Sequence, residues 1–202
     1  MSPALWVLAA YLLGAVPASY LAGRTRGIDL RQHGSKNLGA TNVYRLLGWG
    51  YAVPVGLFDV GKGAAAVALL GRWAHGPDWL PVILGAAAVV GHVFSPFVAF
   101  RGGKGVAAAA GMFLALAPVA VLIAIPVWGL CLWLTGYVSL SSIVAAVSFP
   151  VWVRLTVPDA GPTLAASVVL ALMLVYTHRR NIRRLVAGTE SRFQTRKYGA
   201  AR

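Results

Sequence analysis

Long apolar runs alternate with short polar stretches along this chain. The runs cover residues 3–23, 50–70, 78–100, 106–134, 137–157 and 163–176. A helix rises 1.5 Å per residue, so roughly 20 apolar residues cross the hydrocarbon core of a bilayer. The pattern therefore predicts an all-α integral membrane protein, with residues 1–202 forming a single membrane-embedded domain.

Positive charge predicts the orientation of these runs. Five cations lie in residues 24–47 and eight follow Thr177, so the positive-inside rule places both segments in the cytoplasm and the N-terminus outside. An even number of crossings must then separate Lys104 from the tail. The run at 106–134 is long for one span and contains Pro118 and Pro126, so we split it near Pro118. This gives about seven transmembrane helices, and a five-span arrangement with a re-entrant segment is the alternative.

Composition supports a membrane protein with anionic partners. The chain is 58% apolar and only 11% charged, whereas soluble domains carry about 25% charged residues. Its 18 Lys and Arg against 5 Asp and Glu leave a net charge of +13. Such an excess suits lipid headgroups, phosphorylated substrates, or both. The single cysteine, Cys131, can form no internal disulfide, and the sequence shows no Cys/His spacing typical of a metal site.

Three polar clusters interrupt the apolar pattern, all on the predicted cytoplasmic side. The first, residues 34–45, combines hydroxyls, amides, glycines and two cations, which suit phosphate oxygens. A capped helix at the membrane surface would explain it equally well. The second contains His92, interpreted as a buried structural histidine, and Lys104 among glycines. Exposed backbone amides beside a lysine favour a phosphate, although a lysine reaching the membrane surface is the plainer alternative.

The third cluster, residues 176–190, is explained in part by a basic stop-transfer tail. That interpretation accounts for the arginines but not for His178, Asn181 or Glu190. Within an apolar run, Asp59 and Lys62 are three residues apart, so on a helix they share a face and can pair. A functional role and a neutralised structural pair are equally consistent with this spacing.

Taken together, the segments 34–42, 91–107 and 178–190 resemble the bacterial acyl-phosphate:glycerol-3-phosphate acyltransferases over nearly the whole chain. Lys36 stands where the family more often has glycine. The resemblance implies transfer of a fatty acyl group from acyl-phosphate to the 1-hydroxyl of sn-glycerol 3-phosphate, giving lysophosphatidic acid and phosphate. It also implies independence from acyl-CoA, acyl carrier protein, metals and other cofactors. The implied location is the bacterial inner membrane, with the site facing the cytoplasm.

On this interpretation each candidate residue receives a role. We expect the catalytic residues to be Ser35, Arg45, Lys104, His178 and Asn181. The glycerol-3-phosphate headgroup is assigned to Arg45, Lys104, His178 and Asn181. The acyl-phosphate group is assigned to Ser35, Thr41, Asn42, Ser142 and the amides of Gly102, Gly103 and Gly105, and Asn37 completes the substrate-binding set. Structural roles are expected for Asp59, Lys62, His92 and Glu190, with Glu190 pairing with an arginine of the tail.

The expected partners are glycerol 3-phosphate, a long-chain acyl-phosphate and membrane lipids, with no nucleic acid, and the protein is expected to be a monomer. The proton acceptor is either His178 or a substrate phosphate, whose second pKa of about 6 suits this role. We favour the phosphate, and an acyl-serine at Ser35 is a third route. A transporter for phosphorylated anions is the competing class, but it would need cations along a path to the middle of the bilayer.

Overall fold

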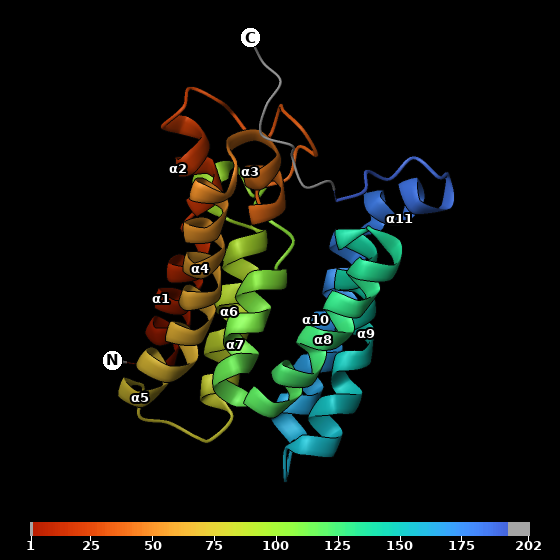
Figure 1. Ribbon diagram of the computed structural model, residues 1–202. Coiled ribbons are helices and arrows are strands. Elements are labelled where there is room, and N and C mark those ends of the chain that lie inside the picture. Colours follow the sequence, from red (N-terminus) through yellow and green to blue (C-terminus); the bar gives the residue numbers. More distant parts are fainter. Residues whose placement is uncertain (1, 194–202) are drawn as a thin grey trace.

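The structure is a computed structural model that describes residues 2–193, and every regular element within that range is helical. The principal helices are α1 (Pro3–Ala15), α2 (Ala18–Arg24), α3 (Ala40–Leu47), α4 (Trp49–Ala65), α6 (Leu80–Val93), α7 (Val106–Leu116), α8 (Pro118–Thr135), α9 (Val138–Thr156), α10 (Gly161–Thr177) and α11 (Arg179–Val186). Figure 1 shows α1, α4, α6 and α7 standing side by side, with α8, α9 and α10 forming a second group.

The predicted membrane-protein class is confirmed. Five helical segments in the described part of the chain are long and apolar enough to cross a bilayer: Pro3–Arg24, Trp49–Trp73, Leu80–Val98, Pro118–Thr135 and Val138–Thr156. Helix α10 gives a sixth when joined to α11 across a 58° bend, while α7 is a shorter apolar helix. The predicted split is also correct, because α7 ends at Leu116 and α8 begins at Pro118.

The first apolar run contains a break that the sequence pattern did not reveal. Helix α1 ends at Ala15 and α2 begins at Ala18, on either side of Pro17, which cannot donate a backbone hydrogen bond. The Ser95 hydroxyl donates to the Ala15 carbonyl at 2.6 Å, and Lys62 Nζ donates to the Val16 carbonyl at 3.0 Å. An unsatisfied carbonyl within a bilayer costs several kcal/mol, so these two hydrogen bonds stabilise the break.

Close backbone contact fixes α7 against α4. A side chain on Gly63 would overlap the carbonyl of Ala108, and one on Gly111 would overlap the carbonyl of Val60. Small residues permit this approach, which membrane helices use in place of a hydrophobic driving force. Because α7 begins at Val106, two residues after Lys104, the contact also fixes the position of the loop that carries the lysine.

Exposed tryptophans mark both ends of the helix bundle. Trp73 and Trp79 lie around the turn between α5 (Gly71–Trp73) and α6, and Trp133 lies near the end of α8. Tryptophan rings gather where lipid headgroups meet the hydrocarbon core. Figure 1 places α5 at the bottom of the bundle and α11 at the top, beside the end of α8.

Candidate active site

The three polar clusters meet at one end of the bundle, around a cavity of about 220 Å³. Most of the residues predicted for the site line it: Ser35, Asn37, Thr41, Asn42, Arg45, Lys104, Gly105, Ser142, His178 and Asn181. They come from the loop before α3, from α3 itself, from the loop before α7, from the first turns of α9 and from the junction between α10 and α11. The predicted convergence of distant segments is therefore confirmed as geometry.

Lys104 connects two of these segments. Its Nζ donates to the Asn181 Oδ1 at 2.7 Å, and its backbone carbonyl accepts from the Thr177 hydroxyl at 3.1 Å. Asn181 in turn donates to a Glu190 oxygen at 2.6 Å. This chain of hydrogen bonds holds the lysine over the junction between α10 and α11. Burial lowers the pKa of Lys104 to about 8; the charge of Glu190 opposes this shift, whereas Arg184 and Arg45 reinforce it.

Glu190 forms the ion pair expected for it and makes two further contacts. Its carboxylate lies 2.6 Å from Arg184 Nε and also accepts from Asn181 and from the Ser139 hydroxyl, the last at 2.7 Å. Burial raises the pKa of the Glu190 carboxyl, but these hydrogen bonds outweigh burial and hold it below its usual value. No sequence pattern predicts the contact between Ser139 and Glu190, because 51 residues separate them.

His178 directly follows α10 and is buried. A hydrogen bond to the backbone defines the tautomer of its ring. Its Nδ1 lies 2.8 Å from the Leu174 carbonyl. A carbonyl can only accept, so Nδ1 carries the proton and Nε2 is left as a hydrogen-bond acceptor. In the neutral ring, Nε2 is therefore suited to accept from a hydroxyl.

Asn42 supports the site rather than presenting a free amide to it. Its Nδ2 donates to the carbonyls of Leu30 and His33, at 3.2 and 3.1 Å, which uses both of its protons. Its Oδ1 accepts from the Ser35 amide at 2.9 Å. The expectation that Asn42 donates to a phosphate is therefore wrong for this conformation. Within residues 2–193, the hydroxyls of Ser35 and Thr41 make no protein hydrogen bond and lie at the cavity wall.

The glycine loop also differs from the expectation. The amide of Gly102 donates to the Val93 carbonyl and that of Gly103 to the His92 carbonyl, at 3.0 and 3.1 Å. Neither residue lines the cavity, so their assignment as phosphate donors is wrong here. Their lack of side chains has another cause: a Cβ on Gly102 would overlap the His92 carbonyl, and one on Gly103 would overlap the His92 ring. Only Gly105, at φ +90°, lies at the cavity itself.

The predicted pairing of Asp59 with Lys62 in α4 is confirmed. Lys62 Nζ lies 2.7 Å from the Asp59 carboxylate, and His92 Nδ1 approaches the same carboxylate at 3.4 Å. All three side chains are buried. Asp59 and His92 also reach the cavity wall, a position that their spacing in the sequence could not show.

An outer bowl of about 850 Å³ lies beside the cavity, and the two share Ser35, Arg45, Glu190 and Ser191. Lys36, Arg184 and Arg192 also line the bowl, so cations outnumber its single carboxylate. Arg45 donates to the Ser191 carbonyl at 3.3 Å, which joins α3 to the segment after α11. Lys36 has φ +57°, a left-handed conformation that glycine adopts without strain.

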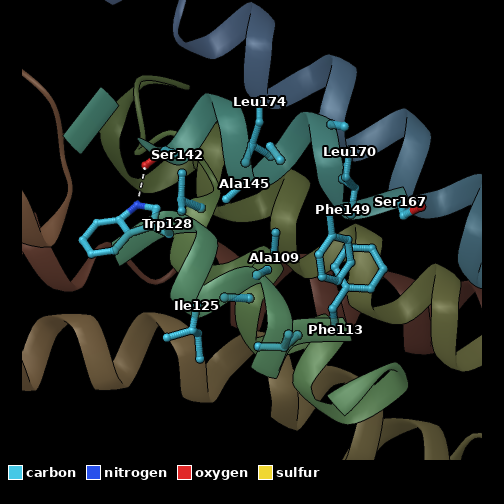
Figure 2. Close-up of a pocket in the computed structure, with 16 residues that line it drawn as sticks. Ala109, Phe113, Ile125, Trp128, Ser142, Ala145, Phe149, Ser167, Leu170 and Leu174 are labelled. Atoms are coloured by element: carbon cyan, nitrogen blue, oxygen red, sulfur yellow. Dashed lines mark hydrogen bonds between the residues drawn. The ribbon is translucent and has the colours of Figure 1, made fainter. Parts of the chain in front are cut away.

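An apolar groove of about 250 Å³ continues from the polar cavity, and the two share Val106, Ala110, Trp128 and Ser142. Figure 2 shows Trp128 beside Ser142, whose hydroxyl accepts from the indole at 3.2 Å. The described residues that line the groove include no charged side chain. Trp128 was not predicted from the sequence, because one aromatic residue within an apolar run carries no distinguishing signal.

Comparison with known proteins agrees with this geometry. Residues 4–188 match the family described as glycerol-3-phosphate acyltransferase. The glycerol-3-phosphate acyltransferase of Desulforudis audaxviator is 50% identical over 190 residues, covering 93% of each chain. That of Synechococcus sp. strain CC9902 is 47% identical over 193 residues, covering 95% of this chain and 96% of its own. The chain therefore belongs to this family of integral, multi-pass membrane acyltransferases.

Solved structures define the family further. The crystal structure of PlsY, an integral membrane glycerol 3-phosphate acyltransferase, in its glycerol 3-phosphate form matches with a TM-score of 0.86. The identity is 38%, and 96% of each chain is covered. The lysophosphatidic acid form of PlsY gives a TM-score of 0.84 at 37% identity. The protein is an enzyme of the PlsY family of glycerol-3-phosphate acyltransferases.

Proposed function

We propose that this protein transfers a fatty acyl group from acyl-phosphate to the 1-hydroxyl of glycerol 3-phosphate, with the cavity as its active site. One observation carries the proposal: a cationic polar cavity opens directly into an uncharged apolar groove. A phosphorylated headgroup suits the first and a fatty chain suits the second. Ser142, with the Trp128 indole beside it, lies at their junction, where an acyl carbonyl would sit.

Both substrates carry phosphate, and cations offset the repulsion between them. Two unit charges 4 Å apart repel by about 4 kcal/mol at an effective dielectric constant near 20. Lys104 and Arg45 line the cavity and carry charge that opposes this repulsion, and we assign the glycerol 3-phosphate headgroup to them together with Asn181. We assign the acyl-phosphate group to the hydroxyls of Ser35 and Thr41 and to the amide of Gly105. Ser142, which the sequence also suggested, donates its proton to the Val138 carbonyl at 2.8 Å and lies beside the acyl group instead.

The reaction then depends more on positioning the two substrates than on activating them. The glycerol hydroxyl oxygen attacks the acyl carbon, the bond from that carbon to the phosphate oxygen breaks, and inorganic phosphate leaves. The hydroxyl proton passes to a substrate phosphate oxygen, whose second pKa is about 6. His178 orients the hydroxyl through its Nε2, because its Nδ1 proton is held by Leu174. Asn42 keeps the Ser35 loop in place.

The donor test distinguishes this activity from other classes. Purified protein in lipid vesicles is given radiolabelled glycerol 3-phosphate with acyl-phosphate, acyl-CoA or acyl carrier protein as donor. We expect labelled lysophosphatidic acid only with acyl-phosphate. Transfer from acyl-CoA alone would overturn the donor assignment, and uptake of label without conversion would support a transporter.

The role of His178 is tested by His178→Gln. Its amide can still contact the hydroxyl, so we expect part of the activity to remain, with a pH profile like that of the wild type. Complete loss of acyl transfer, with glycerol 3-phosphate still bound, would instead make His178 the general base. A trapped acyl-enzyme that disappears in Ser35→Ala would point to the covalent route.

We further propose that the cavity faces the cytoplasm and that one chain suffices. The cationic segments beside the cavity support this orientation, and all the site segments come from a single chain. In a Cys131→Ser background, Gln32→Cys near the cavity and His75→Cys at the opposite end can be labelled in intact cells with a membrane-impermeant thiol reagent. We expect only His75→Cys to react. Reaction of Gln32→Cys alone would reverse the orientation.

A further inference from the structure

The apolar groove has a lining that repeats from helix to helix. Each of four helices contributes residues at positions i, i+3, i+4 and i+7: 106, 109, 110 and 113 from α7; 121, 124, 125 and 128 from α8; 142, 145, 146 and 149 from α9; and 167, 170, 171 and 174 from α10. This spacing presents one face of a helix over two turns, roughly 10 Å. The groove is therefore a four-walled slot with two defined ends.

The two ends of the slot differ in chemistry. Trp128 and Ser142 lie at the end that opens into the polar cavity. Phe113 and Phe149 lie at the other end, each seven residues along its helix from a residue that also lines the polar cavity, Val106 or Ser142. Their rings contact each other, with centroids 4.7 Å apart, and both side chains are buried. Figure 2 shows the two rings side by side, remote from Trp128.

Between the ends, small side chains leave space. The lining there is dominated by alanine, at positions 109, 110, 124, 145, 146 and 171. Alanines at core-facing positions would ordinarily be matched by larger partners that fill the gap. Here the walls remain apart until the phenyl rings close the slot.

We propose that Phe113 and Phe149 form the floor of the acyl-chain site and set the chain length that the enzyme prefers. This inference rests on the proposed function, since the slot must hold the donor's acyl chain. A methylene that enters the slot from water gains up to roughly fourfold in binding, and one that leaves the lipid bilayer gains less, because lipid tails are themselves apolar. A methylene that meets the rings gains nothing, so the preference falls off at the length that reaches them.

The experiment compares kcat/KM across saturated acyl-phosphates of increasing chain length. Phe149→Ala and Phe113→Ala remove the floor, so we expect the ratio of long-donor to short-donor kcat/KM to rise, by up to about fourfold for each additional methylene accommodated. Ala146→Leu fills the slot one turn above Phe149, and we expect the opposite shift. Phe58→Ala is the matched control, because Phe58 is exposed on α4 and does not line the slot.

The outcomes test the floor at Phe113 and Phe149 separately from the proposed acyl-transfer function. Opposite shifts in the floor and wall variants, with Phe58→Ala unchanged, support the floor. An active wild-type enzyme whose variants all keep its chain-length profile would overturn the floor alone. Wild-type protein that transfers no acyl group from any acyl-phosphate would overturn the proposed function and this inference with it. If the alanine variants fold poorly, Ala146→Leu decides, because it adds volume and creates no cavity.

Discussion

Two charged clusters lie within reach of the same cavity, and they differ in how completely they are satisfied. Asp59, Lys62 and His92 form a compact buried group in which the lysine charge is balanced by the carboxylate at 2.7 Å. Around Lys104, in contrast, the single carboxylate of Glu190 is shared with Arg184, and Arg45 adds a further cation.

A charge inside a membrane protein therefore does not by itself mark a binding site. Lys62 also donates to a carbonyl left free by the break at Pro17, so its protons serve the fold. Lys104 lies in a cavity with excess positive charge, where the hydroxyls of Ser35 and Thr41 make no hydrogen bond to any residue in the range 2–193. Net charge and unused hydrogen-bonding capacity therefore separate the two clusters.

The largest expected effect comes from removing the unbalanced charge. Lys104→Met should lower acyl transfer on the order of a hundredfold or more, because a buried charged donor to phosphate is lost. The thermal unfolding temperature should change little, and Lys104→Arg should retain more activity than Lys104→Met. Activity assays on detergent-purified protein, with unfolding followed in parallel, provide the measurement. Equal activity of Lys104→Met and the wild type would remove Lys104 from the site.

In the cluster of Asp59, Lys62 and His92, removal of the lysine should lower the stability of the protein. Lys62→Met leaves Asp59 without its main partner, which should destabilise the protein by about 3–5 kcal/mol. The double variant Asp59→Asn with Lys62→Met removes both charges and should recover much of that stability. Thermal unfolding and the yield of folded protein measure this. A single variant as stable as the wild type would show that the pair is not structural.

The pH dependence should sharpen the distinction further. With a pKa of about 8, Lys104 loses its proton, and hence its positive charge, as pH rises through that value. The KM for glycerol 3-phosphate should therefore rise above pH 8, and a bound phosphate would move the midpoint upward. Lys104→Arg keeps its charge throughout this range and should flatten the profile. Identical profiles for the two proteins would assign the dependence to another group.

The smallest expected effect concerns the left-handed conformation of Lys36. Lys36→Gly should stabilise the loop by about 1 kcal/mol, because glycine adopts φ +57° without strain. The same change removes a cation from the outer bowl, so the KM for glycerol 3-phosphate should rise slightly. Lys36→Gln, which keeps the strain but not the charge, separates the two effects. No gain in unfolding temperature for Lys36→Gly would contradict the strain argument.

Sequence predicted the helices well and the site in part. Apolar run length and Pro118 were enough to predict the division of α7 from α8. The break at Pro17 in the first run could not be predicted, because prolines are tolerated inside membrane helices when neighbours satisfy the freed carbonyls. The residue types at the cavity were predicted, but their partners were not. Asn42 and Gly103 use their donors within the protein, and only the fold shows which donors are already taken.

The shared wall between cavity and groove has a consequence for the product. A lysophosphatidic acid formed there would have its headgroup among the cations and its tail already between α7, α8, α9 and α10. Ile125 lines the groove and is also exposed on the outer surface of the bundle. The product could thus depart sideways between helices and merge with the surrounding lipids, so its tail would never meet water.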